Sequence, residues 1–292
     1  MPSDANLKGH ETLNIPKLQT AKVADDAQSN VAGLRLAYRE TGSADAPALV
    51  FLHGIGSNST GYRNQFSPFS DDFHVVSWDA PGYCGSSHFG METPQTTDYA
   101  DAMAALLDLL AVDNCHIAGS SMGAVIAASF AARYPARVRT LTLVAPATGN
   151  RRLDPTEREA QLASRIGDLE KYGPEGLAAR RASALVSPDA SEQALDAAQE
   201  VVAAINPRGY GQAARMLANA DILEDVMKID IPTLILVGSK DQITPLEACA
   251  KPIYDATHGA EICVLEGAGH LIKLEAPDWF NDMLRTFIER NQ

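Results

Sequence analysis

The sequence has little positive charge, no long apolar run and few cysteines. Lysine and arginine together number 24 against 37 aspartate and glutamate residues, and the formal net charge is -13. Nucleic acids and anionic membranes attract basic surfaces, so we expect neither as a partner. No segment approaches the roughly 18 apolar residues of a membrane-spanning helix, and residues 1–28 lack the apolar core of a signal peptide. We therefore expect a cytoplasmic enzyme or binding protein, and leave a homo-oligomer open.

The four cysteines fit no metal-ligand or redox spacing. Several lie in apolar runs, where a free cysteine behaves as a small buried hydrophobic residue. Cys84 has no histidine or basic neighbour in the sequence that would lower the pKa of its thiol, which disfavours a reactive cysteine. We expect reduced thiols, no metal and no cofactor. The cysteines are Cys84, Cys115, Cys249 and Cys263.

Short apolar runs alternate with longer helical patterns along the chain. Continuous apolarity is typical of strands that are buried on both faces. The alternation predicts an α/β fold with a mostly parallel central sheet and helices on both faces. An antiparallel hairpin is expected over residues 31–39, turning at Gly33. The predicted strands are 48–52, 74–78, 116–118, 140–144, 233–237 and 261–265, and the clearest helices are 93–112, 122–134 and 279–288.

The stretch 148–226 interrupts the alternation of strands and helices. It contains no convincing strand, and Asp154-Pro155 and Asn206-Pro207 are typical helix starts, an N-cap residue followed by proline at the first helical position. We predict a helical cap of about four helices, inserted into a core made of residues 29–147 and 227–292. Residues 1–28 form an N-terminal extension to which we assign no role.

A serine lies at the centre of the pentapeptide Gly-Ser-Ser-Met-Gly, residues 119–123. An apolar strand precedes it and a helix of small residues follows, the context in which G-x-S-x-G indicates a nucleophile on a sharp turn. The two glycines would remove side chains that collide with neighbouring backbone. We predict Ser121 as the nucleophile rather than Ser120, because the glycines flank Ser121 at equal distance. A chance Gly/Ser turn is the alternative.

A nucleophilic serine needs an imidazole within hydrogen-bond reach. His270 follows the last predicted strand and Asp241 follows strand 233–237. Both emerge at the carboxyl edge of the sheet, where open α/β sheets place their sites. The order of serine, acid and histidine is that of hydrolases with this elbow. We predict His270 as the base and Asp241 as the acid that orients it. A turn aspartate capping the helix near Pro245 is the alternative for Asp241.

A glycine-containing loop, His53-Gly-Ile-Gly56, follows strand 48–52. Its small residues let the backbone turn into the site, so we predict the backbone N–H groups of Ile55 and Met122 as the oxyanion hole. Asp79 follows the next strand in a Pro-Gly turn and is predicted to be structural.

Together these segments resemble the α/β-hydrolase superfamily over roughly residues 31–290. The resemblance rests on the H-G-x-G loop at His53, the D-x-P-G turn at Asp79, the Ser121 elbow, the acid turn at Asp241 and the G-x-G-H loop at Gly267. It implies the α/β-hydrolase fold and a Ser-Asp-His triad.

Residues 53–59 and 77–83 look most like the 3-oxoadipate enol-lactonase-like serine esterases. Residues 206–210, in the predicted cap, also resemble these esterases. Residues 120–123 also resemble the meta-cleavage-product hydrolases, which split carbon–carbon bonds. Cys84 stands where the family usually has glycine.

We therefore expect a serine hydrolase of a small-molecule ester or lactone, acting through an acyl-serine intermediate. Carbon–carbon bond hydrolysis of the meta-cleavage-product type is the first alternative. A hydrolase-fold ligand receptor with slow turnover is the second. Arginines of the predicted cap could pair with a substrate carboxylate, but we favour solvated helix faces as their explanation. They are Arg151, Arg152, Arg180 and Arg181.

Overall fold

The structure, a computed structural model, describes residues 14–26 and 29–292. Within them lies one eight-stranded sheet with the order β1-β2-β4-β3-β5-β6-β7-β8. Neighbouring strands from β4 to β8 are parallel, and β1 and β2 add an antiparallel edge. The predicted fold class is confirmed. The strands are β1 (Gln19–Lys22), β2 (Arg35–Thr41), β3 (Ala48–Leu52), β4 (His74–Asp79), β5 (Cys115–Ser120), β6 (Val138–Val144), β7 (Thr233–Gly238) and β8 (Glu261–Leu265).

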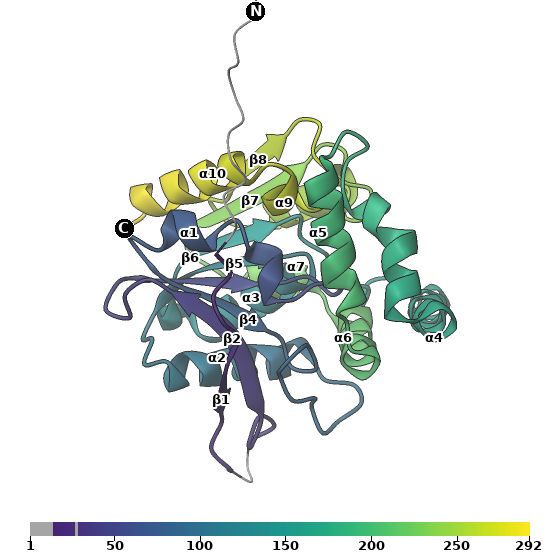
Figure 1. The fold of residues 1–292 in the computed structure, drawn as a ribbon, viewed down its shortest axis with the longest axis horizontal. Helices are drawn as coiled ribbons and strands as arrows, with labels where there is room; N and C mark the ends of the chain where they lie inside the picture. The colour runs from purple at the N-terminus through teal and green to yellow at the C-terminus, as the bar shows by residue number, and fades with distance from the viewer. Residues whose placement is uncertain (1–13, 27–28) are drawn as a thin grey trace, which may run out of the picture.

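Helices cover both faces of the sheet (Figure 1). Val50 and Leu52 of β3 pack into the apolar cluster of one face, while Leu49 and Phe51 pack into the cluster of the other. Burial on both sides is why this strand is apolar at every position. The first face carries α2 (Thr96–Leu109), α3 (Met122–Arg133) and α8 (Lys251–Ala256), and the second carries α1 (Phe66–Phe69) and α10 (Pro277–Arg290). Short turns of helix are η1 (Ser59–Tyr62), η2 (Pro135–Arg137), η3 (Leu246–Ala250) and α9 (Ile272–Glu275).

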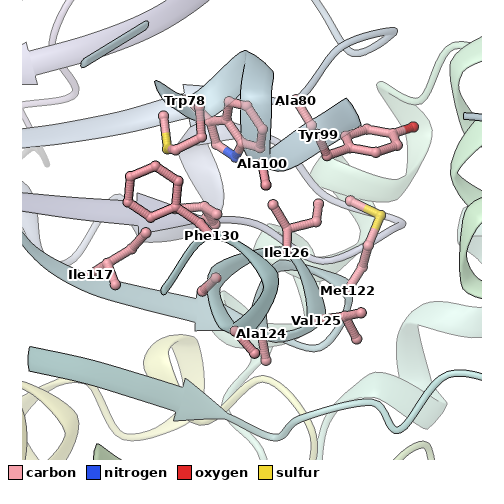
Figure 2. Close-up of a cluster of buried hydrophobic side chains, with 14 of the residues drawn as sticks. Trp78, Ala80, Tyr99, Ala100, Ile117, Met122, Ala124, Val125, Ile126 and Phe130 are labelled. Carbon is pink, nitrogen blue, oxygen red and sulfur yellow. The ribbon is translucent and has the colours of Figure 1, made fainter. Parts of the chain in front are cut away.

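The helix that follows the serine elbow is the centre of the larger cluster. Every residue of α3 from Met122 to Ala131 is buried, and its alanines let the helix lie close to the sheet. Figure 2 shows Ile126 and Phe130 of α3 among the buried side chains that include Trp78 of β4. This packing holds the first turn of α3, and therefore the elbow, in a fixed position.

Four helices lie between β6 and β7. They are α4 (Pro155–Leu185), α5 (Glu192–Ala203), α6 (Pro207–Asn219) and α7 (Ile222–Val226). The Asp154 carboxylate accepts from Thr156 N, and the Asn206 side chain accepts from two backbone N–H groups, as the N-cap patterns suggest. Helices α4, α5 and α6 lie together to one side of the sheet (Figure 1). The last helix, α7, instead packs on α3. None of the helices in the described residues combines the length and apolarity needed to span a bilayer.

The prediction of a hairpin within residues 31–39 is wrong. Strand β2 begins only at Arg35. It pairs antiparallel with β1 on one side, with Gln19 opposite Tyr38, and antiparallel with β4 on the other. Strand β1 therefore belongs to the sheet although its residues fall in the predicted N-terminal extension. Two parts of that extension, residues 1–13 and 27–28, lie outside the described residues. Residues 19–22 are mostly exposed, so they lack the apolar pattern by which a buried strand is recognised.

Cys84 adopts a positive φ of 41° in the turn after β4. A side chain with a Cβ atom is strained there, whereas glycine is not. We expect Cys84→Gly to raise the free energy of unfolding by about 1 kcal/mol, measured by urea denaturation. Cys84→Ala is the matched control, since it removes the sulfur but keeps the Cβ atom; an equal gain in both variants would contradict the backbone explanation.

Candidate active site

Ser121 is the single residue between β5 and α3. Its backbone has φ 55° and ψ -112°, a strained conformation for a residue with a side chain. A Cβ atom on Gly119 would lie 2.1 Å from the Gly123 carbonyl oxygen, and one on Gly123 would lie 2.2 Å from the oxygen of Leu52. Only glycine fits at either position, so the two glycines permit the turn that places Ser121 at the end of a strand and the start of a helix.

Asp241 and His270 meet at the carboxyl edge of the sheet. His270 Nδ1 lies 2.8 Å from Asp241 Oδ2, and both side chains are buried. Asp241 Oδ1 accepts from the backbone N–H groups of Ile243 and Thr244, at 2.8 and 2.9 Å. Burial alone would raise the pKa of the Asp241 carboxyl, but the hydrogen bonds from His270 and Thr244 hold it below its ordinary value. The carboxylate is therefore ionised and its two oxygens have different partners.

The loop after β3 lies directly against Ser121. A Cβ atom on Gly54 would lie 3.3 Å from Ser121 Cβ. The Gly54 carbonyl oxygen lies 2.8 Å from His53 Nδ1 and accepts from Ser57 N. Because a trans peptide points its N–H away from its C=O, these two bonds also orient the Ile55 N–H.

His53 is a structural residue of this loop. Its Nε2 accepts from Ala80 N at 3.0 Å, so Nδ1 carries the proton and donates to Gly54. Burial lowers the pKa of His53 to about 4, which keeps the ring neutral. The Tyr83 hydroxyl donates to Ile55 O at 2.6 Å and holds the following peptide. Met122, whose N–H was the second predicted oxyanion donor, is the first residue of α3, where N–H groups have no acceptor within the helix.

A cavity of about 520 Å³ joins these parts. Ser121, His270 and Ile55 all line it, and helices α4, α5 and α6 supply the opposite wall. Asp241 lies behind His270 rather than on the cavity surface. Between the described residues Ser121 and His270 the structure has no direct hydrogen bond; such bonds are often long before a substrate binds. The four residues predicted from the sequence thus converge on one cavity, with Met122 next to it.

The comparison with protein families agrees with this fold. The model of the family described as alpha/beta hydrolase fold matches residues 47–277, well over half of the chain. The chain belongs to the α/β-hydrolase family.

Characterised relatives of this α/β-hydrolase include different kinds of hydrolase. It is 25% identical to 3-oxoadipate enol-lactonase 2 of Acinetobacter baylyi, over 87% of this chain and 93% of the relative. It is 27% identical to a 2-hydroxy-6-oxononadienedioate/2-hydroxy-6-oxononatrienedioate hydrolase of Burkholderia vietnamiensis, over 88% and 92%. A thermophilic esterase of Thermogutta terrifontis shares the fold, with a TM-score of 0.83 at 23% identity over 93% of this chain and 98% of that one. The chain is a hydrolase-fold enzyme related to enol-lactonases and carbon–carbon hydrolases.

Thr244 is part of this α/β-hydrolase site, and the motifs did not reveal it. Its Oγ1 lies 2.8 Å from Asp241 Oδ2, 3.1 Å from His270 Nδ1 and 3.0 Å from the Ala145 carbonyl oxygen. The hydroxyl therefore holds the acid–histidine pair against the end of β6. Thr244 follows Asp241 by three residues, a spacing typical of a turn closed by a side chain–backbone hydrogen bond. This spacing is the one feature of the sequence that could have indicated its role.

Glu275 and Lys273, on the short helix that follows His270, also contact parts of the site. The sequence motifs predicted neither contact. The Glu275 carboxylate accepts from Gly269 N, just before His270, and from Ser187 N after α4. It thereby ties the histidine loop to the helices of the opposite wall. Lys273 is buried and donates to Ser120 Oγ at 3.0 Å. In the sequence both look like surface charges of a short helix.

Asp79, predicted to be structural, and the histidines His74 and His116 do not line the cavity. His74 Nε2 lies 2.8 Å from Glu40 Oε2, and His116 Nδ1 lies 2.9 Å from Thr140 Oγ1, so both pair within the sheet. Asp79 is buried and accepts from Ser59 N at 2.7 Å. These contacts are structural ones.

Proposed function

We propose that the protein hydrolyses small carboxylic esters or lactones through an acyl intermediate on Ser121. One observation carries the proposal. His270, which is paired with the buried Asp241, lines the same cavity as a serine held on a strained turn at a helix N-terminus. A histidine oriented by a carboxylate can take the proton of a nearby serine and so turn a weak nucleophile into an effective one.

The proposed reaction begins when His270 Nε2 removes the proton of Ser121 Oγ as the oxygen attacks the ester carbonyl. The carbonyl oxygen becomes an oxyanion and accepts from the N–H groups of Ile55 and Met122, each worth about 3 kcal/mol in the transition state. His270 then delivers its proton to the leaving alkoxide. Water, deprotonated by the same imidazole, attacks the acyl-enzyme, and His270 returns that proton to Ser121 Oγ as the acyl–oxygen bond breaks and the acid is released. Asp241 keeps Nδ1 protonated and stabilises the imidazolium.

Thr244→Val tests the role of the hydroxyl that supports this pair. The substitution keeps the shape of the side chain but removes one hydrogen bond to a buried, charged acceptor. We expect kcat/KM for an activated ester to fall about tenfold. The matched control is Thr142→Val, because Thr142 Oγ1 is buried without a partner among the described residues. A loss of equal size in both variants would contradict the assignment to Thr244.

Carbon–carbon bond hydrolysis is the second candidate, because relatives of that kind match most of the chain. That reaction requires a proton to be placed on the leaving carbon before it can depart, in addition to the steps above. Ester and lactone hydrolysis needs only the groups that line the cavity, so we favour it.

Covalent labelling and turnover together test the proposal. A fluorophosphonate probe should modify Ser121, identified by peptide mass spectrometry, and 4-nitrophenyl butyrate should be hydrolysed in many turnovers per enzyme. Failure to label Ser121 would refute the proposed nucleophile. Labelling with at most one turnover would instead support a ligand receptor and overturn the enzymatic proposal. A dienone acid substrate is tested in parallel; turnover of that compound but of no ester would favour carbon–carbon hydrolysis.

A further inference from the structure

The wall of the cavity is cationic although the chain as a whole is acidic. Among the described residues that line it, four are lysine or arginine and none is aspartate or glutamate. The whole chain has the opposite balance, 24 basic against 37 acidic side chains. A cavity of this charge favours an anionic ligand. The four are Arg165, Arg180 and Arg181 of α4 and Lys273 of α9.

Lys273 differs from the three arginines in depth. Its side chain is buried, with 1% of the residue exposed, while Arg180 is exposed and Arg165 and Arg181 are partly exposed. In the described part of the chain no carboxylate pairs with it. Its ammonium donates one hydrogen bond, to Ser120 Oγ, and lies 4.9 Å from the centroid of the Tyr62 ring. Two of its three donors therefore remain for a ligand.

An unpaired buried ammonium is unfavourable for the fold. The backbone of Lys273 is nevertheless fixed, because side-chain amides of Asn64 and Gln65 donate to its carbonyl oxygen. A Cβ atom on Gly61 would lie 2.4 Å from Ser57 Oγ and 3.9 Å from Lys273 Cε, so glycine leaves room beside the ammonium. Ser57, Ser120 and Lys273 all line the cavity, and together they form what we name the lysine recess.

The lysine recess adjoins the nucleophile. Ser120, which accepts from Lys273, directly precedes Ser121, and both serines line the cavity. An anion held by Lys273 therefore shares the cavity with an acyl group on Ser121. Helices α4, α5 and α6 form the opposite wall of the cavity. On the basis of the proposed acyl transfer, we propose that Lys273 determines specificity by binding a carboxylate on the acyl part of the substrate. The substrate class is then monoesters of dicarboxylic acids, or lactones that carry a carboxylate.

The same contact makes the preference depend on pH. Burial lowers the pKa of Lys273 to about 7, so the free enzyme loses this positive charge as the pH rises through 7. Among the described residues, His53 and Tyr62 are titratable groups that interact with it, and His270 lines the same cavity. Burial lowers the pKa of His53 to about 4 and raises that of Tyr62 above its ordinary value, so neither changes charge near pH 7. His270 acts in the same way on both esters of a pair, so its effect on kcat/KM cancels in the ratio of the two values.

Matched pairs of alkyl esters test the proposal. Methanol release is measured for monomethyl succinate against methyl butyrate, and for monomethyl glutarate against methyl valerate. We expect kcat/KM to favour the carboxylated ester of each pair by about tenfold or more. In Lys273→Met this ratio should fall at least tenfold, whatever the change in the neutral ester. Lys273→Arg, which keeps the charge, should retain part of the preference, and the wild-type ratio should fall between pH 6 and pH 9.

Three controls decide the outcome. Lys228→Met removes a lysine whose side chain is 62% exposed and should leave the ratio unchanged. If Arg180→Met or Arg181→Met abolishes the preference and Lys273→Met does not, the assignment to Lys273 is overturned. A wild-type enzyme with no preference, or one for a carboxylate on the alcohol as in O-acetylglycolate, also overturns it. Labelling of Ser121 and turnover of the neutral esters test the proposed ester hydrolysis independently of Lys273. A failure of that proposal can therefore be told apart from a failure of the assignment to Lys273. Thermal unfolding confirms that each variant folds.

Discussion

Replacing Ser121 by alanine should lower kcat for any ester substrate by about 10⁴-fold or more and leave the fold intact. The substitution removes the attacking oxygen and nothing else. It retains the Cβ atom, so the backbone of the elbow, with its φ of 55°, stays in the same conformation. Steady-state kinetics on 4-nitrophenyl butyrate measure the loss, and the fluorophosphonate probe should no longer label the protein.

Ser129→Ala is the matched control for this variant. Ser129 is a buried serine within α3, about two helical turns beyond the elbow and outside the cavity lining. Its replacement should leave kcat within about twofold, as expected for a serine outside the reacting unit. Full activity in Ser121→Ala would refute the nucleophile, whereas a similar loss in both variants would indicate damage to α3.

Asp241→Asn should lower kcat by about 10⁴-fold, the second of the two largest effects. Asp241 Oδ1 already accepts from two backbone N–H groups. An asparagine must therefore keep its carbonyl oxygen at that position and turn its NH₂ group towards His270 Nδ1. This forces Nδ1 to become the acceptor and places the proton on Nε2, so the imidazole can no longer take the serine proton. The same kinetic measurement applies.

The acid-side stability of the protein should change in the same variant. The folded-state pKa of Asp241 lies below its ordinary value of 3.8, so ionisation of this carboxyl stabilises the fold above pH 3.8 and the contribution is lost as the pH falls towards the lower pKa. The free energy of unfolding of Asp241→Asn should lack this dependence. Asp230→Asn removes a carboxylate whose side chain is 97% exposed and should change neither kinetics nor acid stability.

The parts of the fold that could be predicted from the sequence are those with a local pattern. Strands β3 and β8 have the predicted bounds, since a run of apolar residues between turn residues predicts a strand. Strand β3 is buried throughout, whereas β8 is partly exposed. The elbow was predictable for a related reason. Gly119 and Gly123 meet backbone of their own turn and of the adjacent strand, a steric demand that leaves glycine at fixed spacing around the serine.

The histidine and the acid were predictable through topology. In a parallel sheet every strand ends at the same edge, so residues that follow β7 and β8 must lie near one another although 29 positions separate them. Strand β1 offered no such pattern. It is a short, mostly exposed edge strand, and edge strands are recruited by the free hydrogen-bonding groups of a neighbour rather than by their own apolar residues.

The sequence by itself therefore determined the fold class, the serine turn and the edge at which Asp241 and His270 lie, because apolar periodicity, glycine sterics and strand order are local or topological properties. Only the tertiary structure decided that Thr244 supports the acid–histidine pair, that Lys273 is buried beside Ser120 and that the cavity wall is cationic. Burial and pairing of a side chain depend on residues brought together from distant segments, here α4, α9 and the turn before α3, and no single segment contains that information.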